Sequence, residues 1–598
     1  ASCVGFMPML HCRTCSWCPS VASQSAESEN GGIMKKPAPI LPISRMEMDD
    51  LGWEACDIIL ITGDAYVDHP SFGTALIGRY LEGLGYRVGI IPQPDIRGSE
   101  DFLRLGVPGL FVGISSGAMD SMVNHYTSLK RIRSDDAYSE GGKPGKRPDR
   151  AVLKYVNMVQ KTMPGVPVVI GGIEASMRRL SHFDFWSEKV RKSILLDSKA
   201  RILIYGMGEK AVGEIADRIS AGSDLKGIQG TAIYMSSKAF SDSDISEYLE
   251  LPSHEEVVRS PQAFMEMTRL IERESNPWSG STLIQKADNR TIVVYPPQHP
   301  LSTVEMDRVY DLPFSRKPHP VYRGEIPAFR MIRNSITVVR GCAGGCSFCA
   351  LGLHQGRAIS SRSIESVLRE VRKLKLEEYF RGTVTDLGGP TANLYGMGCI
   401  DANAEKKCKR SSCLYPEICP NFRTDHGPYL SLLDSVSRIE GVSNVFVSSG
   451  IRYDVALRDL RFIETLAANH VSGLLKIAPE HFSREVLKLM RKPDPDLFRN
   501  FKDLFEKYSE KVGKKQYIEP YILAAFPGCG MNQMHVTASE LSRQNMRPEK
   551  VQIFLPTPMT MATAMYFTCL HPDTEESIYV ARKPSSRKRQ LACLPGHS

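Results

Sequence analysis

Three cysteines lie close together in the middle of the chain, in a short loop that follows a run of β-branched residues. The stretch Arg340–Cys349 reads Arg-Gly-Cys-Ala-Gly-Gly-Cys-Ser-Phe-Cys, so Cys342, Cys346 and Cys349 have C-x3-C-x2-C spacing. Three thiolates on a glycine-rich loop can bind three irons of a cubane [4Fe-4S] cluster and leave the fourth iron without a protein ligand. An iron with an open position is a place for chemistry.

A zinc site is the alternative interpretation, because cysteines at this spacing also suit tetrahedral zinc. Structural zinc sites take four ligands, and the nearest fourth candidate along the chain is His354. Three cysteines separated by glycines directly after a strand-like run favour the cluster.

A second group of cysteines follows in the same half of the chain, at Cys399, Cys408, Cys413 and Cys419. Four thiolates form a complete ligand set for an auxiliary [4Fe-4S] cluster or for a structural zinc. We favour the cluster, and we expect iron there to pass electrons or to hold substrate. A third group, Cys12, Cys15 and Cys18, lies in a serine-rich segment without periodic pattern, and we interpret residues 1–45 as a disordered or extension segment.

The first triplet resembles the signature of the radical S-adenosylmethionine (SAM) enzymes. In that superfamily the amino and carboxylate groups of SAM bind the open iron, and an electron from the cluster cleaves the sulfonium to give a 5′-deoxyadenosyl radical. The resemblance implies a [4Fe-4S] cluster and SAM as cofactors. It also points to SAM contacts at Arg362, Ser363, Gly388, Gly389, Pro390, Thr391, Ser449 and Arg452.

Each of these contacts has a stated basis and an ordinary structural alternative. Arg362 and Ser363 follow the loop as in methylthiotransferase-like SAM proteins, where they bind SAM's carboxylate or support the loop; a helix N-cap is the alternative. The segment Gly388–Thr391 occupies the place of a Gly-Gly-Glu-type turn whose backbone carbonyls hold SAM's ammonium, and a plain turn is the alternative. Ser449 and Arg452, after the third strand, are expected to contact ribose or carboxylate.

Length and composition describe a globular protein of several domains. The chain has 598 residues, of which 42% are hydrophobic and 24% charged. No apolar run approaches the ~20 residues that span a bilayer, so we expect no membrane association. Clustered cysteines indicate metal binding in a reducing compartment, and we expect a cytoplasmic protein. A net charge of +8 gives little support for a nucleic-acid partner.

The first half of the chain alternates short apolar runs with helical patterns. Such alternation predicts a doubly wound, Rossmann-like parallel sheet over residues 46–236, which binds ligands beyond the carboxyl ends of its strands. The predicted strands are Asp57–Gly63, Arg87–Ile91, Leu110–Ile114, Val166–Gly172 and Arg201–Gly206, with helices at Gly73–Leu84 and Ala151–Met163.

Residues 237–325, richer in Pro, Ser and charge, are predicted to be a connector that contains a helix at Gln262–Glu274. Residues 326–569 are predicted to form a partial (β/α)6 TIM-like barrel with the four-Cys insert, and residues 570–598 a basic tail. The predicted barrel strands are Ser335–Arg340, Gly382–Leu387, Asn444–Ser449, Gly473–Ile477, Tyr517–Ala525 and Val551–Leu555.

The N-terminal pattern looks like the cobalamin-binding-type domain found ahead of the radical barrel in one SAM subgroup. The cobalt-ligating motif of cobalamin proteins is Asp-x-His-x-x-Gly, and Asp68-His69-Pro-Ser-Phe-Gly73 departs from it. We therefore expect His69 to cap or hydrogen-bond the neighbouring backbone; axial ligation of cobalt by His69 is unsupported, and a cobalamin cofactor is doubtful. The mixed segment Arg178–Trp186 is compatible with a polar substrate site or with stacking on the next domain.

Taken together, the chain resembles the YgiQ family of radical SAM proteins, from about Ile43 to Cys569. The matching stretches are Gly63–Gly73, Gly171–Ser176, Gly344–Cys349, Asp386–Asn393, the four-Cys insert and Lys476–His481. The resemblance implies the superfamily fold, a cluster at Cys342, Cys346 and Cys349, and a reducing donor of flavodoxin or ferredoxin type. It brings no settled substrate.

Three functions compete at this point. The first is reductive cleavage of SAM and hydrogen abstraction from an unknown substrate. The second is cobalamin-assisted radical methyl transfer or a methylthiotransferase-like RNA modification. The third is a non-enzymatic iron–sulfur electron carrier or scaffold.

Overall fold

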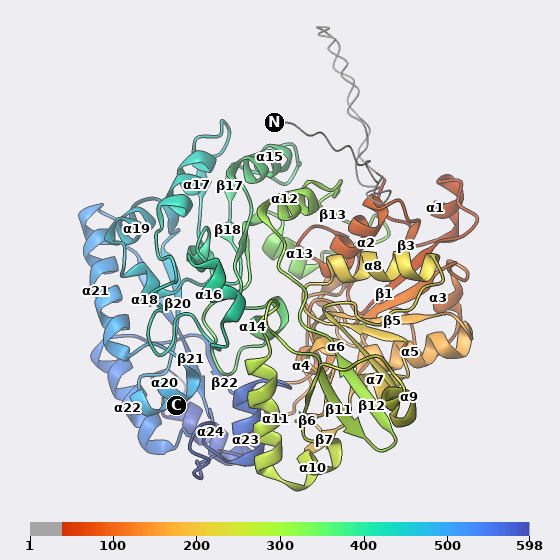
Figure 1. Cartoon of the computed structure of the whole chain (residues 1–598). Helices are drawn as coiled ribbons and strands as arrows, with labels where there is room; N and C mark the ends of the chain where they lie inside the picture. Colours follow the sequence, from red (N-terminus) through yellow and green to blue (C-terminus); the bar gives the residue numbers. More distant parts are fainter. Residues whose placement is uncertain (1–38, 597–598) are drawn as a thin grey trace, which may run out of the picture. The chain divides into compact units, whose positions relative to one another are not determined.

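The computed structural model describes residues 39–596. Two α/β parts are visible in Figure 1, a twisted sheet with helices on both faces and a curved array of strands and helices. Cys12, Cys15 and Cys18 lie outside the described residues. Among residues 39–596, no helix combines the length and the apolar character that crossing a membrane requires.

The N-terminal sheet has nine strands in the order β10-β11-β12-β9-β8-β5-β4-β1-β3. The run β8-β5-β4-β1-β3 is parallel and corresponds to the five predicted strands, which confirms the predicted sheet. The bounds are β1 Ile58–Thr62, β3 Val88–Pro92, β4 Phe111–Ser115, β5 Val168–Ile170, β8 Ile202–Ile204, β9 Thr231–Ser236, β10 Leu249–Glu250, β11 Leu283–Ala287 and β12 Arg290–Val294.

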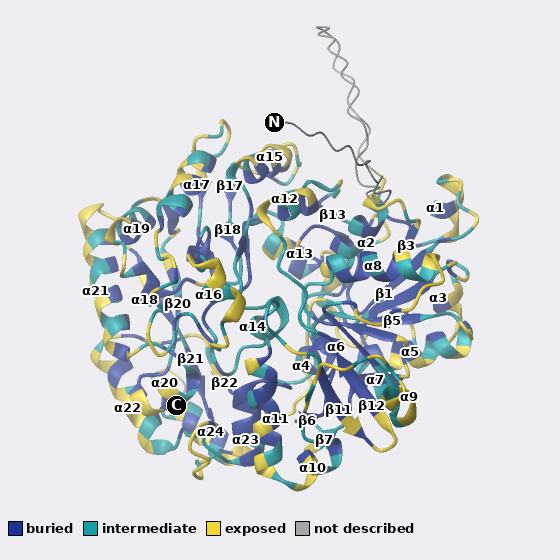
Figure 2. Ribbon diagram, viewed as in Figure 1, coloured by how far each residue is buried: buried dark blue, intermediate teal, exposed yellow. Residues whose placement is uncertain are grey.

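This sheet is doubly wound because alternate side chains of its strands enter two separate cores. In β1, Ile59 and Ile61 pack in the same core as Val152 of α5, whereas Ile58 and Leu60 pack in the same core as Ala75 of α2. Figure 2 shows the buried strands between the flanking helices. The helices of this part are α1 Arg45–Asp50, α2 Gly73–Gly83, α3 Glu100–Leu103, α4 Ser121–His125, α5 Ala151–Thr162, α6 Gly172–Ser176, α7 Ile194–Ser198 and α8 Glu209–Ser220.

The strand order has a topological switch point between β1 and β4. After β1 the chain adds β3 on one side and then crosses to add β4 on the other, which is the flavodoxin-like order. Ligands of such sheets bind outside the carboxyl ends of the strands at the switch point.

Residues 237–325, expected to be a connector, complete the sheet instead of leaving it. β11 and β12 form an antiparallel hairpin, and β12 pairs with β9. The helices here are α9 Ser237–Ser241, α10 His254–Arg259, α11 Pro261–Arg273 and α12 Thr303–Asp311.

The second part contains all six predicted barrel strands. β14 pairs with β18, β17 with β19, and β20, β21 and β22 form a three-stranded group, all in parallel. The bounds are β14 Ser335–Thr337, β15 Val339–Arg340, β16 Ser360–Ser361, β17 Thr383–Val384, β18 Asp386–Gly388, β19 Asn444–Val445, β20 Leu474–Glu480, β21 Tyr517–Ala524 and β22 Val551–Ile553.

Helices flank these strands and confirm the partial barrel. They are α13 Pro327–Ile332, α14 Ala350–Gln355, α15 Ile364–Leu374, α16 Ala402–Lys407, α17 Gly427–Ser437, α18 Tyr453–Ala456, α19 Leu460–Thr465, α20 Arg484–Met490, α21 Pro495–Lys511, α22 Met531–Arg543, α23 Met561–Thr568 and α24 Pro584–Ala592. Helix α24 lies in the basic C-terminal segment and packs against the barrel, where the buried Gln590 accepts from the Ala525 N–H at 2.9 Å.

Candidate functional site: two cysteine groups at the barrel mouth

The loop between β15 and α14 brings the first three cysteines together. It begins at Gly341, whose φ of +80° and close approach to the Ala358 carbonyl require glycine. Within the loop, the Cys349 N–H donates to the Cys346 carbonyl at 3.1 Å. The thiols of Cys342, Cys346 and Cys349 line one cavity of about 540 Å³. The structure thus places all three predicted ligands around a common space.

The three thiols surround a space and do not meet at a point. In residues 39–596, no group of three or more His, Cys, Asp or Glu side chains has an arrangement that could hold a metal ion. A cubane distributes its thiolate ligands over different irons, so cysteines around a cavity fit this group. The zinc alternative is not supported by His354, because its Nδ1 lies 3.1 Å from Ser176 Oγ of the N-terminal domain.

Cations surround the first cysteine group. Arg452 is buried, its Nη1 lies 3.8 Å from Cys346 Sγ, and its Nε donates to Asp454 at 2.8 Å. Burial raises the pKa of Cys346, whereas the charges of Lys492 and Arg452 lower it. These cations favour thiolates, which are the form that binds iron.

The predicted SAM turn lies beside the cysteine loop. β18 pairs with β14, so Thr391 at the end of the turn places its Oγ1 3.4 Å from Cys342 Sγ. A Cβ on Gly389 would lie 2.2 Å from the Val339 carbonyl oxygen, so the turn and the strand that leads to the cysteines are in backbone contact. A Cβ on Gly388 would likewise lie 2.4 Å from Ser449 Oγ. The structure therefore gathers the residues Gly388–Thr391, Ser449 and Arg452 around the cysteine loop.

Asp386 holds the loop that carries Ser449. Its Oδ1 accepts from the Ser448 N–H at 2.8 Å and from the Ser449 N–H at 2.9 Å. Burial raises the pKa of Asp386, and the hydrogen bonds from Ser449 lower it. The Asp386 side chain thus joins the third-strand loop to the glycine turn.

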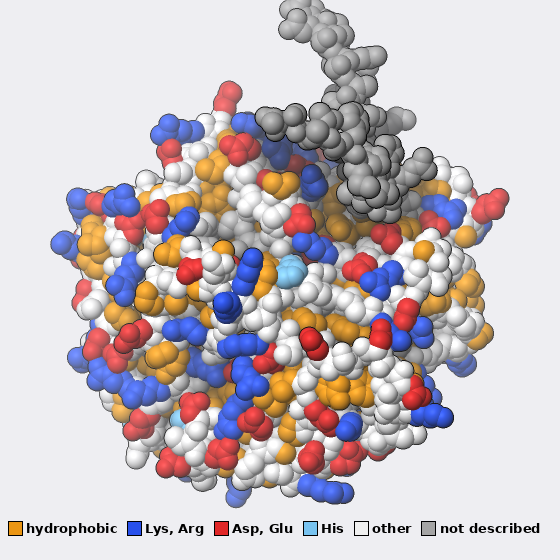
Figure 3. Space-filling model, viewed as in Figure 1, with side chains coloured by type: hydrophobic (Ala, Val, Ile, Leu, Met, Phe, Trp, Pro, Cys, Tyr) orange, Lys and Arg blue, Asp and Glu red, His pale blue; other side chains and the backbone are white. Residues whose placement is uncertain are grey.

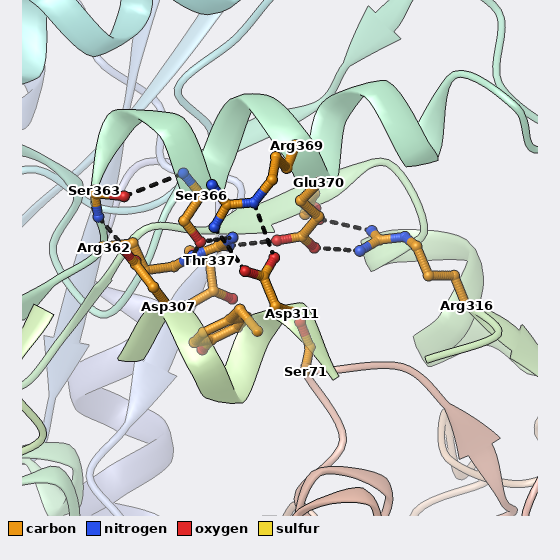
Figure 4. Close-up of polar contacts among 12 residues, drawn as sticks. Ser71, Asp307, Asp311, Arg316, Thr337, Arg362, Ser363, Ser366, Arg369 and Glu370 are labelled. Atoms are coloured by element: carbon orange, nitrogen blue, oxygen red, sulfur yellow. Dashed lines mark hydrogen bonds and ion pairs between the residues drawn. The ribbon is translucent and has the colours of Figure 1, made fainter. Parts of the chain in front are cut away.

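Arg362 and Ser363 differ from the prediction, because the fold uses their polar atoms elsewhere. Arg362 is buried, donates to Ser366 Oγ at 2.8 Å and pairs with Glu370, which Arg316 reaches from the other side (Figure 4). Ser363 caps helix α15 by accepting from the Ser366 N–H at 3.1 Å. The structure supports the helix-cap alternative and a positioning role for both residues.

The four-Cys insert lies against the first cysteine loop. Cys399, Cys408, Cys413 and Cys419 together line a second cavity of about 720 Å³. The insert is attached by the Cys413 N–H, which donates to the Ala343 carbonyl at 3.0 Å, and by Ser412 Oγ, which donates to the Gly344 carbonyl at 2.8 Å.

A third and larger cavity, of about 1750 Å³, separates the N-terminal sheet from the barrel. It lies beyond the carboxyl ends of β1, β4, β5 and β8, and Gly389 and Pro390 of the glycine turn form its opposite wall. About 500 Å³ of it is open to a water-sized molecule, which lies within the ~300–1,000 Å³ usual for small-molecule pockets, so this space suits a small-molecule guest.

His69 does not face this cavity. It is fully buried, and its Nδ1 accepts from the Ser71 N–H at 3.1 Å, as expected from the sequence. The segment Arg178–Trp186 stacks on the barrel, with Phe183 and Phe567 ring centroids 5.0 Å apart, which supports the stacking alternative.

Sequence reasoning missed several cations of the site. Lys492 is buried near Cys346, and Arg491 lines the first cavity while paired with Glu272 at 2.9 Å. Both lie just after α20, far along the chain from the cysteines. No motif marks either residue in the sequence, and the left-handed φ of Arg491, +57°, which ends helix α20, is visible only in the structure.

A partial barrel preceded by a doubly wound domain, with three cysteines of one loop beside a glycine turn, defines a radical SAM protein. Family models agree: Radical SAM N-terminal matches residues 40–335, Radical SAM superfamily matches 336–515, and a domain of unknown function (DUF3362) matches 549–597. Curated relatives that are 46–47% identical over at least 90% of this chain show that the chain belongs to the UPF0313 family.

Curated UPF0313 proteins match over most of their length. The protein of Rhodopseudomonas palustris is 46% identical over 559 residues, which are 90% of this chain and 83% of that protein. The proteins of Geobacter sulfurreducens and Thermotoga neapolitana are each 47% identical, over 93% and 92% of this chain and 92% and 97% of their own lengths. The family is therefore shown across both parts of the fold.

A solved structure shares the fold. It is the radical SAM methyltransferase TsrM from Kitasatospora setae with cobalamin and a [4Fe-4S] cluster bound, at a TM-score of 0.50 and 15% identity over 90% of this chain and 85% of that one. The chain is thus a radical SAM enzyme, which takes a [4Fe-4S] cluster and SAM and requires a reductant and a substrate.

Proposed function

We propose that Cys342, Cys346 and Cys349 bind the [4Fe-4S] cluster of this radical SAM enzyme and that SAM binds between the cluster and the turn Gly388–Thr391. The observation that carries the proposal is the cavity of about 540 Å³ that all three thiols line. The open iron would face the turn, because Thr391 already approaches Cys342.

The remaining residues position the cofactors. When bound, the cluster supplies the electron that cleaves SAM to the 5′-deoxyadenosyl radical. Arg452, held by Asp454, offers a fixed positive charge beside Cys346. Ser449, held by Asp386, lies next to the glycine turn and would contact SAM bound at that turn. The N-terminal domain covers the barrel mouth and limits the access of water to the reacting centre.

The test is anaerobic reconstitution with iron and sulfide, followed by a measurement of 5′-deoxyadenosine formed from SAM. We expect Cys346→Ala to lose SAM cleavage and the iron of this site. Cys593→Ala is a matched control, because Cys593 ends helix α24 and donates to the Gln590 carbonyl at 3.1 Å, outside both cysteine cavities. Cleavage retained in Cys346→Ala would refute the ligand assignment.

A second candidate function is favoured by the cavity of about 1750 Å³. Its place at the switch point of the sheet, opposite the glycine turn, suits a corrin, which would supply methyl-transfer chemistry. His69 faces away, so the corrin would bind without this histidine as an axial ligand. Protein from cobalamin-supplemented cells would carry a corrin absorption spectrum, and Thr74→Trp, which fills the cavity, would abolish it. The absence of corrin absorption in the wild-type protein would rule out this candidate function.

We further propose an acidic protein of flavodoxin or ferredoxin type as the reductant, and a cytoplasmic location. Exposed Lys406, Lys407, Lys409 and Arg410 lie on the four-Cys insert, where Figure 3 shows basic side chains gathered over and below α16. They outnumber the exposed acids Asp401 and Glu417 of the same insert.

We propose a domain division near residue 326, after the last strands of the N-terminal sheet.

A further inference from the structure

We infer that Cys399, Cys408, Cys413 and Cys419 bind a second [4Fe-4S] cluster, fully ligated by the protein, that exchanges single electrons with the first cluster. The ligand set stands on its own geometry. The electron exchange rests on the proposed function of Cys342, Cys346 and Cys349.

The shape of the insert gathers four thiols around an open space. The Cys419 N–H donates to the Cys413 carbonyl at 2.8 Å, and the backbones of Cys399 and Phe422 form an isolated antiparallel β-bridge. The turns of the insert therefore fold back on one another. The cavity of about 720 Å³ that results is lined by all four cysteines together with Trp278 and Phe422. All four predicted ligands thus share one partly apolar pocket.

The spread of the four thiols distinguishes the two metals that four thiolates can bind, because among residues 39–596 no three His, Cys, Asp or Glu side chains are arranged to hold a single metal ion. Zinc binds each thiolate at about 2.3 Å, so four sulfurs around zinc stand close together and leave no space between them. A cubane cluster fills a volume between its ligands because each thiolate binds a different iron. A pocket lined by four thiols and by aromatic rings therefore suits the cluster.

An unpaired cation lies between the two cysteine groups. Arg357 lines the cavity of the first group and also the cavity of the second. Its Nε is buried without a hydrogen-bond partner among the described residues. Arg357 is half-buried, so its partly desolvated guanidinium favours a nearby counter-charge, and an anionic thiolate cluster on each side would supply it.

The backbone holds the insert directly against the first loop. A Cβ on Gly345 would lie 2.5 Å from the Ser411 carbonyl oxygen, and Gly345 has a φ of +62°, so only glycine permits this contact. Together with the bonds from Ser412 and Cys413 to Gly344 and Ala343, this contact makes the two loops one unit.

The electron balance of the inferred step is simple. An external one-electron donor is oxidised as the second cluster is reduced from the 2+ to the 1+ state. The second cluster returns to 2+ as the first is reduced from 2+ to 1+. No bond forms or breaks at the second cluster, because four thiolates leave no open iron for SAM or substrate.

The ligand set is tested on full-length protein reconstituted anaerobically with iron and sulfide. We expect about eight irons per chain in the wild type and about four in the triple variant Cys342→Ser/Cys346→Ser/Cys349→Ser. The variant should give an electron paramagnetic resonance signal of a reduced [4Fe-4S] cluster. Zinc in place of iron in protein purified without reconstitution, or four irons in the wild type that vanish in the triple variant, would overturn the inference.

This design separates the inference from the proposed function. If the first site does not bind iron, the triple variant and the wild type carry the same four irons. If the second site does not, Cys408→Ser/Cys413→Ser keeps all the iron of the wild type. Because the wild-type iron count and its Mössbauer spectrum need no variant, misfolding of a variant still leaves the number of clusters decided.

The coupling is tested at Arg357. We expect Arg357→Gln to move the midpoint potentials of both clusters to more negative values, because a nearby positive charge stabilises the reduced states. Arg423→Gln is the matched control, since Arg423 is exposed four residues after Cys419 and lines neither cavity. A shift in the midpoint potential of only one cluster would contradict the inference that Arg357 lies between the two clusters.

The electron exchange itself is tested by rapid freezing after mixing with titanium(III) citrate. We expect the first cluster of Cys408→Ser/Cys413→Ser to be reduced at least tenfold more slowly than that of the wild type. Equal reduction rates would overturn the electron-transfer role while leaving the ligand set in place.

Discussion

The contact between Gly389 and Val339 gives the sharpest test of the SAM site. A Cβ at position 389 would lie 2.2 Å from the Val339 carbonyl oxygen and 2.9 Å from its Cγ1, and real Cβ atoms essentially never approach below 3.0 Å. The nearest atom belongs to the backbone, so Gly389→Ala must move main chain by the difference between 2.2 and 3.0 Å. The change pushes the glycine turn away from the strand that leads to the cysteines.

The expected effects follow from the size of that displacement. Overpacking of this kind costs about 1–3 kcal/mol of unfolding free energy. A displacement of about 1 Å in a catalytic constellation lowers the rate by about 100-fold. We therefore expect a moderate loss of stability and a 100-fold loss of 5′-deoxyadenosine formation, with iron content unchanged.

The assay compares Gly389→Ala with Gly98→Ala in anaerobic SAM cleavage and in chemical denaturation. Gly98 is exposed in the N-terminal domain, lines none of the three cavities, and a Cβ there meets no atom within 4 Å. The control should behave as wild type in both measurements. Wild-type SAM affinity and cleavage in Gly389→Ala would refute the placement of SAM at this turn.

Three further predictions concern buried charges. Arg452→Met should lower the unfolding free energy by about 3–5 kcal/mol because it leaves Asp454 buried and unpaired, and adding Asp454→Leu should recover part of the loss in denaturant titrations. Arg362→Met should cost less than Arg452→Met because Arg316 still pairs with Glu370, and calorimetric SAM affinity should stay within a factor of two; a tenfold weaker affinity would support the predicted SAM contact instead. Burial lowers the pKa of His426 to about 4 from 6.5, so the unfolded state binds more protons between these values and stability falls as pH drops through this window, by up to about 1.4 kcal/mol per pH unit. His426→Gln should flatten that part of the stability curve, and an unchanged slope would contradict the cause.

The parallel strands were predictable because their chemistry is local. Runs such as Ile58–Thr62 are buried on both faces and therefore read as continuous apolar segments. The strands within residues 237–325 were missed because tertiary partners satisfy their polar residues. Gln285 of β11 is buried, and its Oε1 accepts from the Ser181 N–H at 2.8 Å, a bond that no local pattern reveals.

The same distinction applies to the site. Cysteine spacing and the glycine turn carry their chemistry in a few adjacent residues, so they were found from sequence. Lys492 and Arg491 reach the cysteines only through the packing of α20, and nothing in their own neighbourhood marks them. Arg362 was assigned to SAM because its position matches a motif, whereas its buried partners Ser366 and Glu370 lie one and two turns further along the same helix.

The cysteine loop is anchored to the N-terminal domain at both of its ends. Before it, Arg340 pairs with Glu209 and donates to the Tyr310 hydroxyl at 3.1 Å; after it, His354 meets Ser176. A barrel produced without the first half of the chain would lose these contacts, and its cysteine loop would have to fold without them. Complementation between separately produced halves is thus a more faithful way to dissect this enzyme than truncation.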